Sequence, residues 1–153
     1  MLALLIWIQW VPRAQGGPDP KLTPGVFVSA VSCLGEEPPS IALALATEVF
    51  RRYGIAKPRP GEFEVDYLIP PDLGGTADPG NLWPQPYSRG VWNSRVKDAL
   101  EDRLKASVCS GKMGLAEAQR DLQNGWVEAY KRHFRTQQPL YEHAGFIKDR
   151  AWE

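Results

Sequence analysis

The chain has 153 residues, of which 43% are hydrophobic and 24% charged, and it contains six tryptophans. Such a composition is typical of one globular domain and excludes a largely disordered chain. The 18 basic and 18 acidic residues give a formal net charge of +0, which excludes a global field that attracts nucleic acid or an anionic membrane.

The two cysteines lie far apart without a Cys-x-x-Cys pair, and the only imidazoles are those of His133 and His143. A structural zinc site therefore has too few ligands. Residues 1–80 carry a charge of −3 and residues 81–153 carry +3. This bias suits phosphate binding by the C-terminal helices, but solvated helix faces carry as much.

The first eleven residues, MLALLIWIQWV, form an apolar run that is too short to span a bilayer, and Pro12 ends it. A signal peptide has a central region of this length, but no basic residue precedes the run and the cleavage site around Ala14 is poor. Two interpretations follow: a leader over residues 1–15 of a secreted or periplasmic protein, or a segment packed into a cytoplasmic one. The first predicts a disulfide between Cys33 and Cys109, and the second predicts buried free thiols. Neither includes a transmembrane span.

Residues 16–39 are rich in Pro and Gly, which indicates a linker or a wrapping arm with room for one short strand over residues 26–31. Ser40 then precedes an amphipathic segment that ends before Gly54. This pattern predicts a helix with Ser40 as its N-cap.

Residues 63–69 alternate between apolar and polar side chains, which predicts a strand with one buried face. Asp66 and Tyr67 then point to opposite faces. A loop with Gly74 and Gly75 follows, and residues 81–85 allow a brief second strand. Apolar residues recur at four-residue steps from Trp92 to residue 108, and apolar residues also line one side of residues 115–134, which predicts two helices. A tail over residues 137–153 contains Pro139.

Five sequence words occur in this order: EVDYLIPPDLGG, NLWPQPY, WNSRVKDALEDRL, VCSG and AEAQRDLQNGWVEAYK. Together they resemble the HNH-like (ββα-metal) nucleases, in particular a branch of small, often secreted proteins whose first word normally reads Glu-Val-Asp-His-Leu-Ile-Pro. The resemblance covers about half the chain. It implies an α+β fold over residues 40–136, with a ββα-metal core, a preceding helix and an additional C-terminal helix.

The resemblance also implies a site for metal-dependent hydrolysis of phosphodiesters. It assigns Asp66 to one divalent ion of the Mg or Mn type, Tyr67 to the position of the general base, and Asn81 to the asparagine that orients that base. Asn93 or Arg95 lies near the place of the helix ligand, and only the asparagine could coordinate a metal. A nucleic acid is the implied partner, and basic residues of the predicted helix are available to contact it: Arg95, Lys97, Arg103 and Lys105.

Tyr67 departs from the family pattern. A phenol with a pKa near 10 is protonated at neutral pH, unlike a histidine with a pKa near 6.5, and losing a general base costs on the order of 10² to 10⁴ in rate. Tyr67 therefore has three interpretations: a core aromatic, a phenolate nucleophile, or the remnant of a lost base. If the remaining site is intact, Tyr67→His should raise cleavage by at least about 10²-fold.

The other residues also have structural alternatives. Asp66 could cap the loop or pair with Lys97, Asn81 could terminate a turn, and the two loop glycines are turn residues rather than a phosphate cradle. We therefore rank a degenerate nuclease-like domain first and a weak nuclease second. A non-catalytic secreted domain that binds nucleic acid or protein, or that is purely structural, is the third hypothesis.

Overall fold

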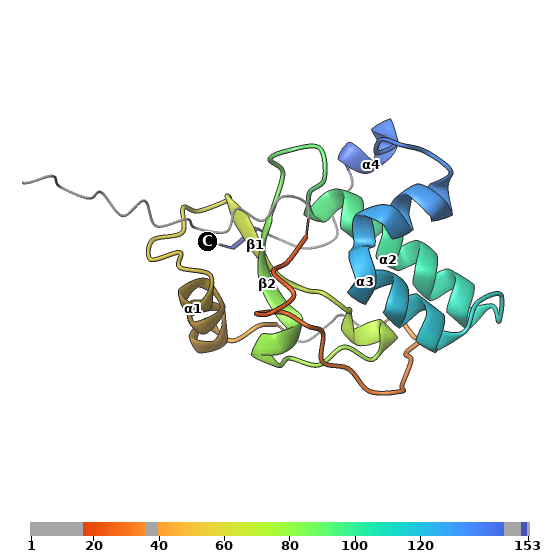
Figure 1. Ribbon diagram of the computed structural model, residues 1–153, viewed down its shortest axis with the longest axis horizontal. Helices are drawn as coiled ribbons and strands as arrows, with labels where there is room; N and C mark the ends of the chain where they lie inside the picture. The colour runs from red at the N-terminus through yellow and green to blue at the C-terminus, as the bar shows by residue number, and fades with distance from the viewer. Residues whose placement is uncertain (1–16, 36–39, 146–150, 153) are drawn as a thin grey trace, which may run out of the picture.

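The computed structural model describes residues 17–35, 40–145 and 151–152. Its helices and strands (Figure 1) follow in the order α1 (Leu43–Arg52), β1 (Phe63–Tyr67), η1 (Pro71–Leu73), η2 (Pro79–Asn81), β2 (Leu82–Pro86), α2 (Ser94–Cys109), α3 (Leu115–Phe134) and α4 (Tyr141–Ala144). The protein is thus a mixed α+β fold, as predicted. The two predicted strands and the helices that follow them are present.

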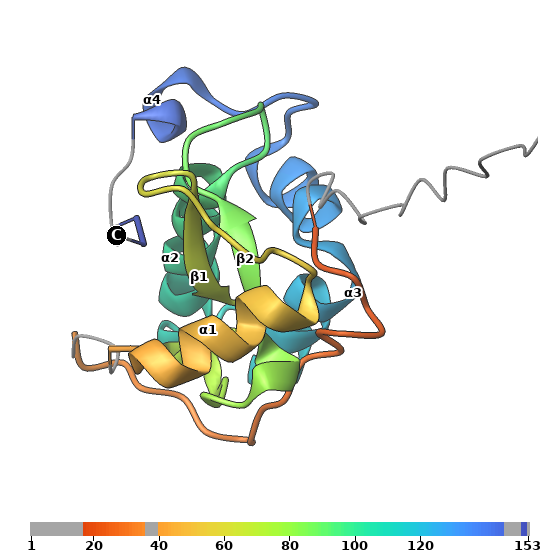
Figure 2. The same cartoon turned by 90° about the vertical axis from the view of Figure 1, so that its left-hand side faces the viewer.

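The sheet of the described residues consists of β1 and β2, which pair antiparallel with Asp66 opposite Trp83 and Tyr67 opposite Leu82. Figures 1 and 2 show α1 on one side of these strands and α2 with α3 on the other. Because successive side chains of a strand point to opposite faces, β1 has one face for each layer. Tyr67 belongs to the apolar cluster that contains α1 residues, whereas Asp66 contacts α2.

Helix α1 begins at Leu43, after Ala42 as its N-cap, and no side chain caps it. The prediction that Ser40 caps this helix was therefore wrong, since Ser40 lies two residues before the cap. The helix buries Ala46, Val49 and Phe50 against the sheet. This apolar face is what the sequence pattern predicted, and burying each large side chain contributes about 1.5 to 3 kcal/mol.

Helix α2 begins two residues after Trp92, where the apolar repeat starts, and ends one residue after that repeat, with Ser110 as the C-cap. Helix α3 has the predicted bounds, but Gly125 interrupts it with φ 141° and ψ 93°. A straight helix would separate residues twelve apart by about 18 Å. The bend instead lets Asp121 bind Arg132 and His133, both at 2.7 Å.

The Pro- and Gly-rich segment is a wrapping arm rather than a free linker (red and orange in Figure 1). Its backbone is hydrogen-bonded to the loop before β2, with Val28 N–H donating to the Gly74 carbonyl at 2.9 Å. The expected strand over residues 26–31 is reduced to a single bridge between Phe27 and Gly75. A Cβ on Gly74 would lie 2.2 Å from the Val28 carbonyl oxygen, so the close approach of the arm to this loop requires glycine at position 74.

A disulfide joins Cys33, at the end of the arm, to Cys109, at the end of α2, with a Cα–Cα distance of 5.7 Å. The predicted pairing is confirmed, and the disulfide fixes the arm to the end of α2, in the helix layer formed by α2 and α3.

The tail, for which no element was predicted, contains the short helix α4, and its residue Trp152 contacts the sheet. Trp152 N–H donates to the Phe63 carbonyl at 2.8 Å, and the Trp152 ring contacts Phe50 edge to face. Trp152 thus contacts the chain at the start of β1.

The predicted leader lies outside the described residues. Within the described ranges, no helix is long and apolar enough to cross a membrane.

Candidate functional site

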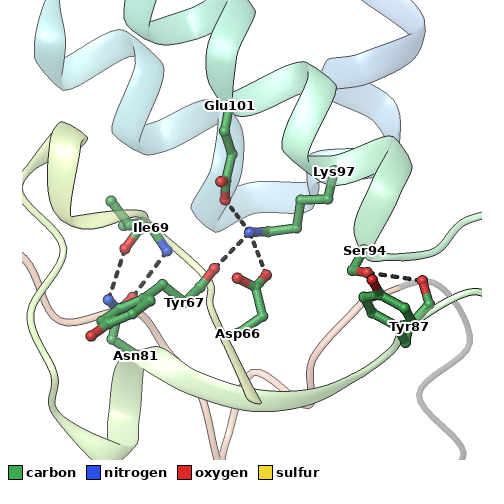
Figure 3. A network of polar contacts seen from close by, with 8 residues as sticks. All are labelled: Asp66, Tyr67, Ile69, Asn81, Tyr87, Ser94, Lys97 and Glu101. Carbon is green, nitrogen blue, oxygen red and sulfur yellow. Dashed lines mark hydrogen bonds and ion pairs between the residues drawn. The ribbon is translucent and has the colours of Figure 1, made fainter. Parts of the chain in front are cut away.

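Asp66 points from β1 toward α2 and forms an ion pair with Lys97 (Figure 3). Its Oδ2 atom accepts a hydrogen bond from Lys97 Nζ at 2.7 Å. The same ammonium donates to the Tyr67 carbonyl at 2.6 Å and to the carboxylate of Glu101, one turn further along α2. The sequence left three roles open for Asp66: metal ligand, loop cap and partner of Lys97. The structure contains the pair with Lys97.

This ammonium is completely buried, with 0% of the Lys97 side chain exposed. Burial by itself lowers the pKa of Lys97, but the adjacent carboxylates of Asp66 and Glu101 outweigh it and hold the pKa above its ordinary value. Lys97 therefore stays charged at any physiological pH. A buried permanent cation is retained only where carboxylates surround it, as here.

Tyr67 faces the opposite layer. The residue is 7% exposed, and its side chain packs in the apolar cluster with Val49, Phe50 and Leu82. In Figure 3 its ring extends away from Lys97 while the Asp66 carboxylate points to it. The phenol and the carboxylate thus lie on two sides of the strand. Tyr67 packs as a core aromatic, as one of the interpretations of the sequence predicted.

Asn81 is fully buried and holds the loop between the strands. Its Oδ1 accepts from the Ile69 N–H at 3.1 Å, and its Nδ2 donates to the carbonyls of Ile69 (2.9 Å) and Thr76 (3.0 Å). Both polar atoms of the amide are therefore bonded to backbone. The asparagine thus braces residues 69–76, and Figure 3 shows its two hydrogen bonds to Ile69.

Asn93 is the N-cap of α2. Its Oδ1 accepts from the Val96 N–H at 3.4 Å, and its Nδ2 donates to the Gly90 carbonyl at 3.1 Å. Capping satisfies one of the free amide groups at the start of the helix. Helix α2 also begins with a contact from Ser94, whose hydroxyl donates to the Tyr87 carbonyl at 2.9 Å.

These positions do not fit the divalent ion that the resemblance implied. Asp66 already binds an ammonium, and the side-chain oxygen of Asn93 accepts from the helix backbone. In the part of the chain that the structure describes, no group of three or more His, Cys, Asp or Glu side chains could hold a metal. Asp66, Asn81 and Asn93 have structural partners instead of a common ion.

The basic residues expected to contact nucleic acid all have partners within the chain. Lys97 is buried and out of reach of a phosphate. Arg95 lies over the Tyr87 ring, Arg103 lies over the Phe134 ring, and Lys105 forms an ion pair with Asp72. Lys97 is therefore excluded from a basic surface, whereas Arg103 is exposed and Arg95 and Lys105 are partly exposed.

Glu101 is the site residue that the sequence analysis missed. Its spacing of four from Lys97 is that of an ion pair on one helix face. The available signal was the strand, in which Glu64 and Asp66 alternate with apolar residues and so give β1 a polar face. Both carboxylates are buried, so a buried basic partner on the covering helix could have been expected.

Searches of family models, of curated proteins and of solved structures found no match to this chain.

Proposed function

We propose that this chain is a nuclease-like domain that does not use a divalent ion to hydrolyse phosphodiesters, and that its role is non-catalytic. The observation that carries the proposal is the ion pair between Asp66 and the buried Lys97. Asp66 is the carboxylate that the HNH-like resemblance would assign to the metal.

The charge of Lys97 opposes a metal at this position. Two unit charges 4 Å apart interact by about 4 kcal/mol at an effective dielectric constant of about 20. A doubly charged ion beside Asp66 would meet about twice that repulsion from the Lys97 ammonium. The ion would have to displace a lysine side chain that is fully buried.

The position of Tyr67 supports the same conclusion. A general base must reach the water that the metal binds. The phenol packs against α1, whereas the Asp66 carboxylate contacts α2. A Tyr67 phenolate that acted as a nucleophile would also lie on the opposite side of the strand from the Asp66 carboxylate. This separation weakens the alternative of an active nuclease.

The disulfide between Cys33 and Cys109 is compatible with an extracellular location. We propose that the domain acts in a secreted or periplasmic setting, where this bond persists. A fractionation of producing cells would test the location, and a reduced protein confined to the cytoplasm would refute it.

The experiment for the main proposal is a cleavage assay on supercoiled plasmid and single-stranded DNA with Mg²⁺ or Mn²⁺. We expect no cleavage by the oxidised wild-type protein, and no gain from Tyr67→His, because Asp66 remains paired in that variant. Tyr67→Phe is the matched control. Cleavage by the wild type, or a gain of about 10²-fold or more in Tyr67→His, the lower range of a general-base contribution, would refute the proposal.

A further inference from the structure

The sequence contains three asparagines, and the structure places them in two different environments. Asn81 and Asn93 are buried, and both amide atoms of each side chain are hydrogen-bonded to the backbone. Asn124 lies on α3 and is exposed, and the residue that follows it is Gly125. Asn124 is therefore the asparagine whose amide is open to water and whose next residue has no side chain to shield the backbone.

The peptide between Asn124 and Gly125 lies where α3 is interrupted. Gly125 has φ 141° and ψ 93°, so the first helical segment ends at Asn124 and the second begins at Trp126. Peptides inside a continuous helix are held by hydrogen bonds to the neighbouring turns, whereas helix ends fray. A Cβ on Gly125 would meet no atom within 4 Å. Asn124 and Gly125 also line a cavity of about 300 Å³ between α3 and the arm, so the backbone here has room to move.

We propose that Asn124–Gly125 is a site of spontaneous deamidation. The backbone nitrogen of Gly125 attacks the side-chain amide carbon of Asn124. A bond forms between these two atoms, the bond from that carbon to Nδ2 breaks, and Nδ2 leaves as ammonia with the proton of the Gly125 N–H. Water then opens the succinimide ring, adding OH to one of its two carbonyl carbons and H to the ring nitrogen. The product is aspartate or isoaspartate, according to which carbon the water attacks.

The modification changes both the charge and the backbone at the bend. A neutral amide becomes a carboxylate in the wall of the cavity. Isoaspartate also adds a methylene to the main chain, next to Gln123, whose Nε2 donates to the Pro24 carbonyl of the arm at 2.8 Å. The modified residue therefore lies beside a contact between α3 and the arm. The reaction uses none of the residues on which the proposed function rests.

The experiment follows the purified, oxidised protein at mildly alkaline pH by ion-exchange chromatography and peptide mass mapping. We expect an acidic form to accumulate, with its mass change in the peptide that contains Asn124. A protease that cleaves before aspartate and not before isoaspartate separates the two products. Asn81 and Asn93 should react at least about 10-fold more slowly, because their amides must first be released by local opening. Asn124→Gln is the matched control: it keeps an exposed amide but closes the corresponding larger ring far more slowly, so no acidic form should accumulate.

The same measurement on the urea-unfolded protein separates the effect of the bend from that of the Asn–Gly sequence. A continuous helix would protect this peptide, whereas at the bend the folded protein should react within about 10-fold of the unfolded rate. The proposal is overturned if Asn124 stays intact in the folded protein or reacts more slowly than that. It is equally overturned if the acidic form persists in Asn124→Gln, or if aspartate forms without isoaspartate, because water would then attack the amide without a ring intermediate.

Discussion

Removing the disulfide between Cys33 and Cys109 is expected to cost more stability than any other change of two exposed side chains. The bond joins residues 76 positions apart. In the chain-entropy model, a closed loop of this length lowers the stability of the unfolded state by about 4.5 kcal/mol. At about 2 to 4 °C per kcal/mol for a chain of this size, the midpoint of thermal unfolding should fall by roughly 9 to 18 °C.

The test uses the double variant Cys33→Ser, Cys109→Ser, because both cysteines are exposed and serine leaves no cavity. Urea unfolding followed by tryptophan fluorescence gives the free energy for the wild type and the variant, each with and without a thiol reductant. The reductant should destabilise the wild type to the level of the variant and leave the variant unchanged.

The outcome also tests how the arm is held. Without the disulfide, the arm keeps its backbone hydrogen bonds from Gly25 to Gly80, from Val28 to Gly74 and from Ser32 to Asp72. Since the arm then depends on these hydrogen bonds in place of a covalent link, amide hydrogen exchange should accelerate in the arm before it does in the rest of the domain. A loss below about 1 kcal/mol, well under the usual range of 2 to 4 kcal/mol, would refute the reasoning, since it would mean that the unfolded chain gains little freedom when the bond is absent.

Two further predictions concern single polar side chains. Asn81→Ala should destabilise the protein by about 3 kcal/mol in urea unfolding, since it leaves the Ile69 N–H and two carbonyls buried without partners; exposed Asn124→Ala is the control, and equal effects would contradict the role of Asn81 as a brace. Burial lowers the pKa of His143, against the smaller opposing effect of Glu142, and Tyr130 is hydrogen-bonded to its Nδ1. Neutral His143 should thus stabilise the tail fully above the unfolded pKa of about 6.5, and this stability should be lost as pH falls through the lower folded pKa. The stability difference between the wild type and His143→Gln should therefore shrink from pH 8 to pH 5, and a constant difference would contradict the prediction.

Local sequence patterns predicted the helices and strands, because the formation of a helix or a strand depends mainly on residues that are close together in the chain. The alternation around Asp66 gave β1 its two faces, and the four-residue spacing from Val96 to Leu104 gave α2 its buried side. The N-cap of α1 was wrongly predicted at Ser40, because several polar or small residues lie near the start of the helix and the sequence does not choose among them. The bend at Gly125 was missed because glycine is also tolerated inside straight helices.

The candidate site was decided by tertiary structure. The sequence named Asp66, Tyr67, Asn81 and Asn93, and it also named Lys97 as an alternative partner of Asp66. Only the packing of α2 on β1 decides whether the Asp66 carboxylate has a metal ion or the Lys97 ammonium as its partner. Residues 31 positions apart meet there, and no local pattern encodes which lysine of an amphipathic helix turns inward.

The disulfide shows the same division. The sequence supplied two cysteines and a reason to expect their pairing in an oxidising compartment. The arm that brings Cys33 to Cys109 follows a path set by backbone contacts with the loop before β2, where Gly74 allows the arm to approach the loop. Composition alone predicted that residues 16–39 contain no long helix. Only the contacts with the folded domain decided that residues 17–35 wrap around it, because a segment rich in Pro and Gly has no preferred path of its own.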